Sequence, residues 1–176
     1  MITAHLPAGY VLGRALSGRR AKAEILWPAI LGAVLPDIDL LYYYFVDQGQ
    51  VHHHLYPAHW PLFWVGLCLL PALTAAGAGQ VRLLMAILAF LGGALLHLAL
   101  DSIASPVYWL MPFDQAPVEL VQVPARYGHW AISFLLHWTF LIELSIWILA
   151  ATLYFRRPAR RRLFGPRPGA NSLSLS

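Results

Sequence analysis

Four long apolar stretches dominate the sequence and set its fold class. They cover residues 25–46, 60–78, 81–100 and 130–155, each near the roughly 20 residues that a helix needs to cross a bilayer. A shorter stretch, residues 2–16, is marginal for a span and fits a short or re-entrant membrane helix. Only 11% of the residues are charged, well below the roughly one quarter typical of soluble domains. The chain is therefore predicted to be an integral membrane protein.

The stretches predict an all-α fold, a polytopic membrane helical bundle with four full spans and a short N-terminal membrane helix. We expect residues 1–155 to form the membrane-embedded domain. Residues 156–176 are rich in Arg, Pro, Gly and Ser and predict a basic, disordered tail against anionic lipid headgroups. Binding of nucleic acid by this tail is the less favoured alternative.

Basic residues are distributed unequally between the two sides of such a bundle. If the chain crosses at each predicted span, 11 of the 12 Lys and Arg residues fall on one side and only Arg126 falls opposite. The eleven are Arg14, Arg19, Arg20, Lys22, Arg82, Arg156, Arg157, Arg160, Arg161, Arg162 and Arg167. The positive-inside rule makes their side the cytoplasm. This predicts a cytoplasmic C-terminus and two external loops, at residues 47–59 and 101–129.

Ionisable residues inside the apolar stretches are costly, and they mark functional sites by default. His97 and Asp101 lie four residues apart, so on a helix the imidazole and the carboxylate stack on one face. One face then offers a nitrogen and an oxygen ligand to a single ion. The alternative is a hydrogen-bonded pair that only stabilises a buried helix.

Two further carboxylates follow a proline in the first long stretch, in the sequence Leu35-Pro36-Asp37-Ile38-Asp39. Pro36 lacks an N–H and disfavours helix before it, so a break in the span is expected there. Such a break turns one or both carboxylates toward a cavity. The alternative is an Asp-capped helix start, although two uncompensated carboxylates within a span call for a cation.

Histidines are concentrated in the first external loop, at His52, His53, His54 and His59. Solvated polarity is the plain alternative for such a cluster, but the topology puts it on the same side as Asp101. Further candidate ligands are His5, His129, His137 and Glu143. His137 and Glu143 lie six residues apart, about 120° around a helix, so both cannot face one ion.

No sequence motif indicates a competing chemistry. There is no Gly-x-x-x-x-Gly-Lys loop, no Gly-x-Ser-x-Gly elbow and no Cys-x-x-Cys pair, and the one cysteine, Cys68, excludes an intrachain disulfide. A ligand set rich in histidine favours Zn²⁺, Mn²⁺ or Fe²⁺ over Mg²⁺ or Ca²⁺. A divalent metal, with zinc preferred, is the cofactor that we predict.

The order of these motifs resembles the YdjM family of inner-membrane proteins, described as metal-dependent hydrolases. The resemblance covers about residues 1–115 and is specific at residues 35–39 and 93–101. The family's His-Arg-Gly-x-Thr-His-Ser corresponds here to His54-Leu-Tyr-Pro-Ala-His59-Trp60, which keeps both histidines at the same separation. The family's later Glu has no clear counterpart, because Gly128-His129-Trp130 occupies roughly that place. The last ligand is left open between His129, His137 and Glu143.

The resemblance implies an inner-membrane location. A distant similarity of that family to zinc-dependent phospholipases C and single-strand nucleases implies phosphoester hydrolysis. We predict a metal-dependent hydrolase with its site toward the external face, acting on an ester of a lipid or lipid-linked substrate through metal-activated water. The predicted ligands are His54, His59, His97, Asp101 and Asp37, followed by His5 and Asp39. Asp39 or His129 is the predicted general base.

Two other functional classes remain open at this point. In a transporter, the same acids and histidines would relay protons or metal ions, and a polar path would continue to the cytoplasmic side. The sequence offers few buried polar groups toward that side, which favours the enzyme. The third possibility is a structural or regulatory membrane protein whose metal only stabilises the fold.

Overall fold

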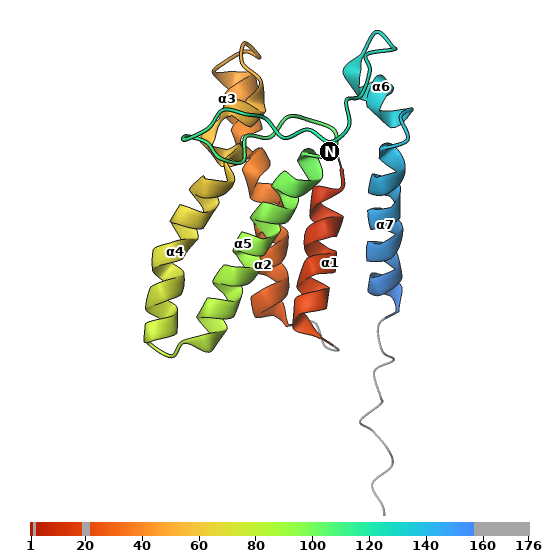
Figure 1. Cartoon of the computed structure of the whole chain (residues 1–176). Helices are drawn as coiled ribbons and strands as arrows, with labels where there is room; N and C mark the ends of the chain where they lie inside the picture. Colours follow the sequence, from red (N-terminus) through yellow and green to blue (C-terminus); the bar gives the residue numbers. More distant parts are fainter. Residues whose placement is uncertain (2, 19–21, 157–176) are drawn as a thin grey trace, which may run out of the picture.

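The computed structural model describes residues 1, 3–18 and 22–156. Within these residues the regular structure is helical, apart from one isolated antiparallel bridge between Val107 and Val118. The helices stand side by side as an up-and-down bundle (Figure 1). The all-α prediction is therefore confirmed for this part of the chain. Residues 157–176, which are all of the predicted basic tail except Arg156, lie outside the described residues, as do Arg19 and Arg20.

Five longer helices make up the bundle. They are α1 (His5–Ser17), α2 (Ala23–Val34), α4 (Pro61–Gly77), α5 (Val81–Asp101) and α7 (Phe140–Phe155). Shorter elements lie at one end of it: η1 (Leu35–Ile38), α3 (Asp39–Phe45), η2 (His53–Leu55), η3 (Pro57–His59) and α6 (Trp130–Leu135). The polar elements η2 and η3 are thus gathered at the end of the bundle where α2 finishes and α4 begins.

Two helical segments are long and apolar enough to cross a membrane, Ala23–Phe45 and Val81–Asp101. The apolar helices α4 and α7 have 17 and 16 residues. At 1.5 Å per residue each is about 25 Å long, compared with about 30 Å for the hydrocarbon core of a bilayer. Of the four predicted spans, two meet the length criterion within the described residues.

The last predicted stretch, residues 130–155, is divided into α6 and α7 rather than forming one helix. Between them, Nδ1 of His137 lies 3.0 Å from the Thr139 hydroxyl. Local side-chain bonds of this kind compete with helical hydrogen bonding, and α7 begins at the next residue. The break at Pro36 agrees with expectation: α2 ends at Val34, and the tighter turn η1 leads into α3.

Close packing of α1, α2 and α5 depends on glycine. A Cβ atom added to Gly32 would lie 2.0 Å from the Phe90 carbonyl oxygen, and one added to Gly93 would lie 2.3 Å from that of Ala29. Gly9 of α1 is similarly tight against α2, with Ala33 Cβ only 2.7 Å from such an atom. Small residues let helices approach within a membrane, and here they bring the α2 and α5 backbones into direct contact.

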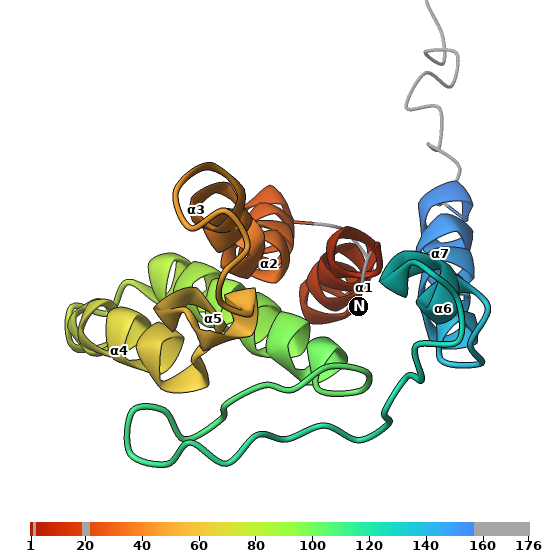
Figure 2. The same cartoon turned by 90° about the horizontal axis from the view of Figure 1, so that it is seen from above.

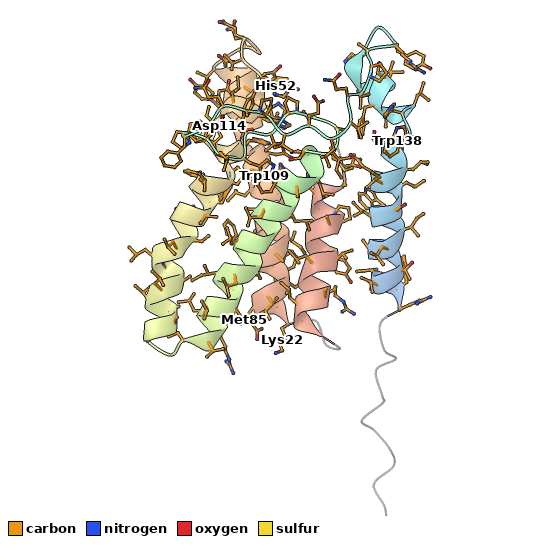
Figure 3. All side chains as sticks on the ribbon, in the orientation of Figure 1. Lys22, His52, Met85, Trp109, Asp114 and Trp138 are labelled. Carbon is orange, nitrogen blue, oxygen red and sulfur yellow. The ribbon has the colours of Figure 1, made fainter. Side chains whose placement is uncertain are left out.

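The connection between α5 and α6 lies at the same end of the bundle (Figure 1), and seen from above it passes beside α5 on its way to α6 (Figure 2). Its returning segment is held just after the end of α5, since the amides of Leu120 and Val121 donate to the carbonyls of Ser102 and Ile103 at 2.8 and 2.9 Å. In Figure 3, His52, Trp109 and Trp138 lie at this end, whereas Lys22 lies at the opposite end. The bundle is thus polarised, with histidine-bearing segments at one end.

Candidate metal centre

The seven predicted ligands come together in a single cluster. They are His5, Asp37, Asp39, His54, His59, His97 and Asp101, drawn from α1, η1, α3, η2, η3 and α5. The cluster lies at the end of the bundle where η2 and η3 pack against the last turn of α5. Residues nearly 100 positions apart in sequence thus meet at one place.

Asp101 is at the centre of this cluster. Its Oδ2 atom lies 3.1 Å from Nε2 of His97, 3.6 Å from Nε2 of His54 and 3.7 Å from Nε2 of His59. Its other oxygen, Oδ1, lies 3.2 Å from Nε2 of His5 and also contacts the Met1 amino group. The Asp101 side chain is 1% exposed, so its charge is met by protein groups rather than by water.

Asp37 forms the open side of the cluster. Its Oδ1 atom lies 3.6 Å from Nε2 of His97 and 3.8 Å from Nε2 of His59. The Asp37 side chain is 31% exposed, whereas those of His59 and His97 are fully buried. An incoming molecule would reach the cluster beside Asp37.

The three central histidines are oriented alike by their second ring nitrogens. Nδ1 of His97 donates to the Ala33 carbonyl at 2.8 Å, and Nδ1 of His54 donates to the Pro106 carbonyl at 2.9 Å. A carbonyl oxygen can only accept, which fixes a proton on Nδ1, so in the neutral ring the lone pair is on Nε2. Nδ1 of His59 lies 2.6 Å from Oδ2 of Asp39 and is fixed in the same way.

These lone pairs converge without a hydrogen-bond donor between them. Nε2 of His59, Nε2 of His97 and Oδ2 of Asp101 are buried and have no hydrogen-bond partner. Leaving buried polar atoms unsatisfied costs about 1–3 kcal/mol each. A proton on one ring would satisfy one nitrogen–oxygen pair, whereas a divalent cation would satisfy all three of these ligand atoms at once.

His53 joins the cluster although nothing in its spacing distinguishes it from its neighbours. His53, His54 and His59 offer ligand atoms within 4.8 Å of one another. Burial lowers the pKa of His53 to about 4 and that of His54 to about 2. Both rings are therefore neutral near pH 7, which is the state that binds metal. The signal in the sequence is that His53 directly precedes His54.

His5 approaches from α1. Its ring stacks on that of His97, with centroids 3.7 Å apart, and its Nε2 atom also lies 3.1 Å from the Met1 carbonyl oxygen. His5, His97 and Asp101 form a second group of ligand atoms within 4.8 Å of one another, and Asp37, His59 and His97 form a third. Asp39 belongs to none of the three groups and lies behind His59.

The three residues considered for the last ligand have other contacts. His129 accepts a hydrogen bond from the Ala131 amide at the start of α6, at 3.2 Å, and His137 bonds to the Thr139 hydroxyl. Glu143 accepts from the amide and the hydroxyl of Thr3, at 3.0 and 2.7 Å. Glu143 therefore ties α7 to the segment that carries His5, and none of the three belongs to a ligand group.

A pocket of about 390 Å³ adjoins the cluster. It is lined by Asp39, Tyr42, Tyr56, Pro57 and Ala58. Asp39 is the polar link between pocket and cluster, because its Oδ2 atom holds His59 while its Oδ1 atom is buried without a hydrogen-bond partner. The rest of the lining is aromatic or apolar, which suits the apolar part of a ligand.

A family model described as YdjM inner membrane protein matches residues 1–163. No curated protein and no solved structure is significantly similar to the chain.

Proposed function

This chain belongs to the YdjM inner membrane protein family, and on that premise we propose that it is a membrane-bound, metal-dependent hydrolase. Its substrate in this proposal is a lipid or lipid-linked molecule with a phosphoester or other ester bond. The ligands are His54, His59, His97, Asp101 and Asp37, with His5 beside them.

One observation carries the proposal: the three central histidines all direct Nε2 lone pairs toward Asp101. Oxygen atoms that accept the Nδ1–H hydrogen bond, and so fix the histidine tautomer, usually accompany metal-ligating histidines. A purely structural histidine–carboxylate pair needs one such arrangement. Three arrangements aimed at one carboxylate are explained by a cation at their centre.

The chemistry follows from the donor set. Nitrogen-rich ligation with two carboxylates suits Zn²⁺, with Mn²⁺ or Fe²⁺ as alternatives. Such an ion supplies a bound water of lowered pKa and polarises the oxygen of the scissile group. Asp37 borders the open side, where it can orient that water. Of the two predicted general bases, Asp39 adjoins the cluster, whereas His129 contacts the start of α6.

We place the cluster on the external face of the inner membrane, with four spans in residues 1–155 and a cytoplasmic C-terminal tail. Arg14, Lys22, Arg82 and Arg156 lie at helix ends away from the cluster, which supports this orientation under the positive-inside rule. The shorter helices α4 and α7 would cross with local thinning of the bilayer.

A lipid-like substrate is supported by the surface of α3. Tyr44 and Phe45 are 64% and 81% exposed, and Tyr42 lines the pocket beside Asp39. Aromatic side chains at this level are typical of a membrane interface. A lipid whose polar head reaches the cluster would keep its chains in the bilayer beside α3.

A transport function receives less support. From His97 toward the opposite end of the bundle, the helices that surround the cluster contain no further acid or histidine until Glu24 at the start of α2. A proton or metal-ion path normally needs such groups along its length.

The test uses the full chain purified in detergent. Its metal content is measured by mass spectrometry, and hydrolysis of a chromogenic phosphodiester is followed before and after chelation and after return of Zn²⁺ or Mn²⁺. We expect chelation to abolish the activity and returned metal to restore it. The His97→Ala variant should be inactive, whereas the His129→Ala variant should retain most of the activity. Protein that takes up no metal would overturn the proposal. Bound metal without hydrolysis of any ester in a substrate panel would indicate a structural ion.

A further inference from the structure

The cluster contains more ligand atoms than one ion can use. Seven side chains take part in its ligand groups: His5, Asp37, His53, His54, His59, His97 and Asp101. A zinc ion in a protein is usually four-coordinate, and a catalytic zinc takes three protein ligands and a water. The donor set is therefore about twice what a single catalytic ion needs.

Two of the ligand groups share no residue. One consists of His53, His54 and His59 from η2 and η3, and the other consists of His5, His97 and Asp101 from α1 and α5. Each group supplies three donors. Each therefore matches, by itself, the protein contribution to one catalytic ion.

The two carboxylates lie between these groups. Oδ1 of Asp37 is 3.8 Å from Nε2 of His59 in the first group and 3.6 Å from Nε2 of His97 in the second. Asp101 belongs to the second group, yet its Oδ2 atom is 3.6 Å from Nε2 of His54 in the first. A carboxylate that reaches donors of both groups is in the position of a bridging ligand.

Buried polar atoms without a partner occur in both groups. Nε2 of His59 belongs to the first group, and Nδ1 of His5, Nε2 of His97 and Oδ2 of Asp101 belong to the second. His59 and His97 are fully buried and His5 is 4% exposed. A single ion between His59, His97 and Asp101 would satisfy three of these atoms, but it would leave Nδ1 of His5 unsatisfied and the ring of His53 without a ligand role.

From this arrangement we propose that the cluster is a binuclear centre, with one divalent cation in each three-residue group and Asp37 and Asp101 between the two. This inference rests on the proposed metal-binding function and deepens it. Two dications bring four positive charges, and the Met1 amino group beside Asp101 a fifth, against the negative charges of Asp37, Asp101 and the adjoining Asp39. The remaining positive charge favours an anionic substrate, and pairs of metal ions are typical of enzymes that cleave phosphoesters.

The test is metal stoichiometry. The detergent-purified full chain is saturated with Mn²⁺, desalted and analysed for metal per chain, and its electron paramagnetic resonance spectrum is recorded. We expect two ions per chain and a spin-coupled spectrum. His53→Ala and, independently, His5→Ala should each reduce the content to one ion and abolish the coupling. His52→Ala is the matched control, since His52 lies beside His53 but outside every ligand group, and should retain two ions.

Wild-type protein that saturates at one ion, or an uncoupled spectrum at two, overturns the binuclear centre. This conclusion needs no variant, so misfolding of a variant does not affect it. If the protein binds one ion and hydrolyses an ester, the binuclear centre is wrong but the proposed function stands. If it binds two coupled ions and hydrolyses no ester, the binuclear centre stands but the proposed hydrolase function is wrong.

Discussion

Nδ1 of His59 lies 2.6 Å from Oδ2 of Asp39, and both side chains are buried. The pair joins the start of α3 to the end of η3, two elements on either side of the histidine-bearing loop. Because the Asp39 carboxylate accepts the hydrogen bond from Nδ1–H, the Nε2 atom of the imidazole is directed toward Asp101. Asp39 therefore acts on the cluster through His59.

Substitution of Asp39 should consequently weaken metal binding without abolishing it. Loss of a carboxylate that holds a metal-ligating histidine typically reduces metal affinity about 10- to 100-fold. We expect a loss of about that size for Asp39→Ala and a smaller one for Asp39→Asn, which keeps an acceptor oxygen. Competition against a fluorescent zinc chelator measures both. Equal affinity in wild type and Asp39→Ala would show that the pair does not orient a ligand.

Asp101 should behave differently, because its two oxygens face four histidines. We expect Asp101→Ala to lose bound metal and hydrolysis together. Removing one partner of a buried ion pair also costs about 3–5 kcal/mol of unfolding free energy, so stability must be measured in the same samples. A folded Asp101→Ala protein with normal metal content and normal hydrolysis would contradict the site. His137→Ala, distant from the ligand groups, is the control.

The metal-free protein should lose stability as the pH falls. Burial lowers the pKa of His53 from its ordinary 6.5 to about 4. Between these values the unfolded chain binds a proton that the folded chain does not, so the unfolding free energy decreases as pH falls from about 6.5 to about 4. His54, with a pKa of about 2, extends the decrease further. Thermal unfolding in detergent at several pH values measures it, and His53→Ala should show a shallower decrease.

Packing between α2 and α5 should be sensitive at Gly93. A Cβ at this position meets the Ala29 carbonyl at 2.3 Å, so Gly93→Ala must push the helices apart. Overpacking of this kind costs about 1–3 kcal/mol of unfolding free energy. It should also weaken metal binding, because the nearby bond from His97 to the Ala33 carbonyl depends on the same contact. Gly66→Ala in α4 meets no atom within 4 Å, so it should not lower the unfolding free energy and should leave metal binding unchanged.

Membrane orientation can be tested with topology reporters. A reporter fused after Phe155 should report a cytoplasmic location, and one inserted near Gln50 should report an external one, because basic residues are concentrated on one side. An insertion at Gly79, between α4 and α5, is a second cytoplasmic position. The opposite result at all three positions would move the cluster to the cytoplasmic face.

Much of the fold and of the cluster was predictable from residue type and spacing. The 20-residue apolar stretches indicated the helices, Pro36 indicated the break after α2, and His97 and Asp101 share a helix face. The match over residues 1–163 confirms the resemblance to the YdjM family. The expected run over residues 130–155 was too long, since hydropathy alone does not register the local bond between His137 and Thr139.

The sequence could not reveal contacts made by the backbone. The carbonyls of Ala33 and Pro106 orient two histidines, but a carbonyl is present in every residue and leaves no mark on the pattern. Nor could spacing select His53, since its place beside His59 depends on how two short 3₁₀ turns fold against each other. Asp39 was expected as a ligand or a base, whereas its position behind His59 became visible only in three dimensions.

The dispersal of the ligands along the chain has a consequence for biogenesis. The chain is synthesised from its N-terminus. When α4 has emerged from the ribosome, the histidines of η2 and η3 are therefore present before His97 and Asp101. The complete cluster forms only when α5 docks on α2. Metal must then arrive from the aqueous compartment that the cluster faces. Under our proposal this compartment is external, so the supply of metal there would govern maturation of the protein independently of its synthesis.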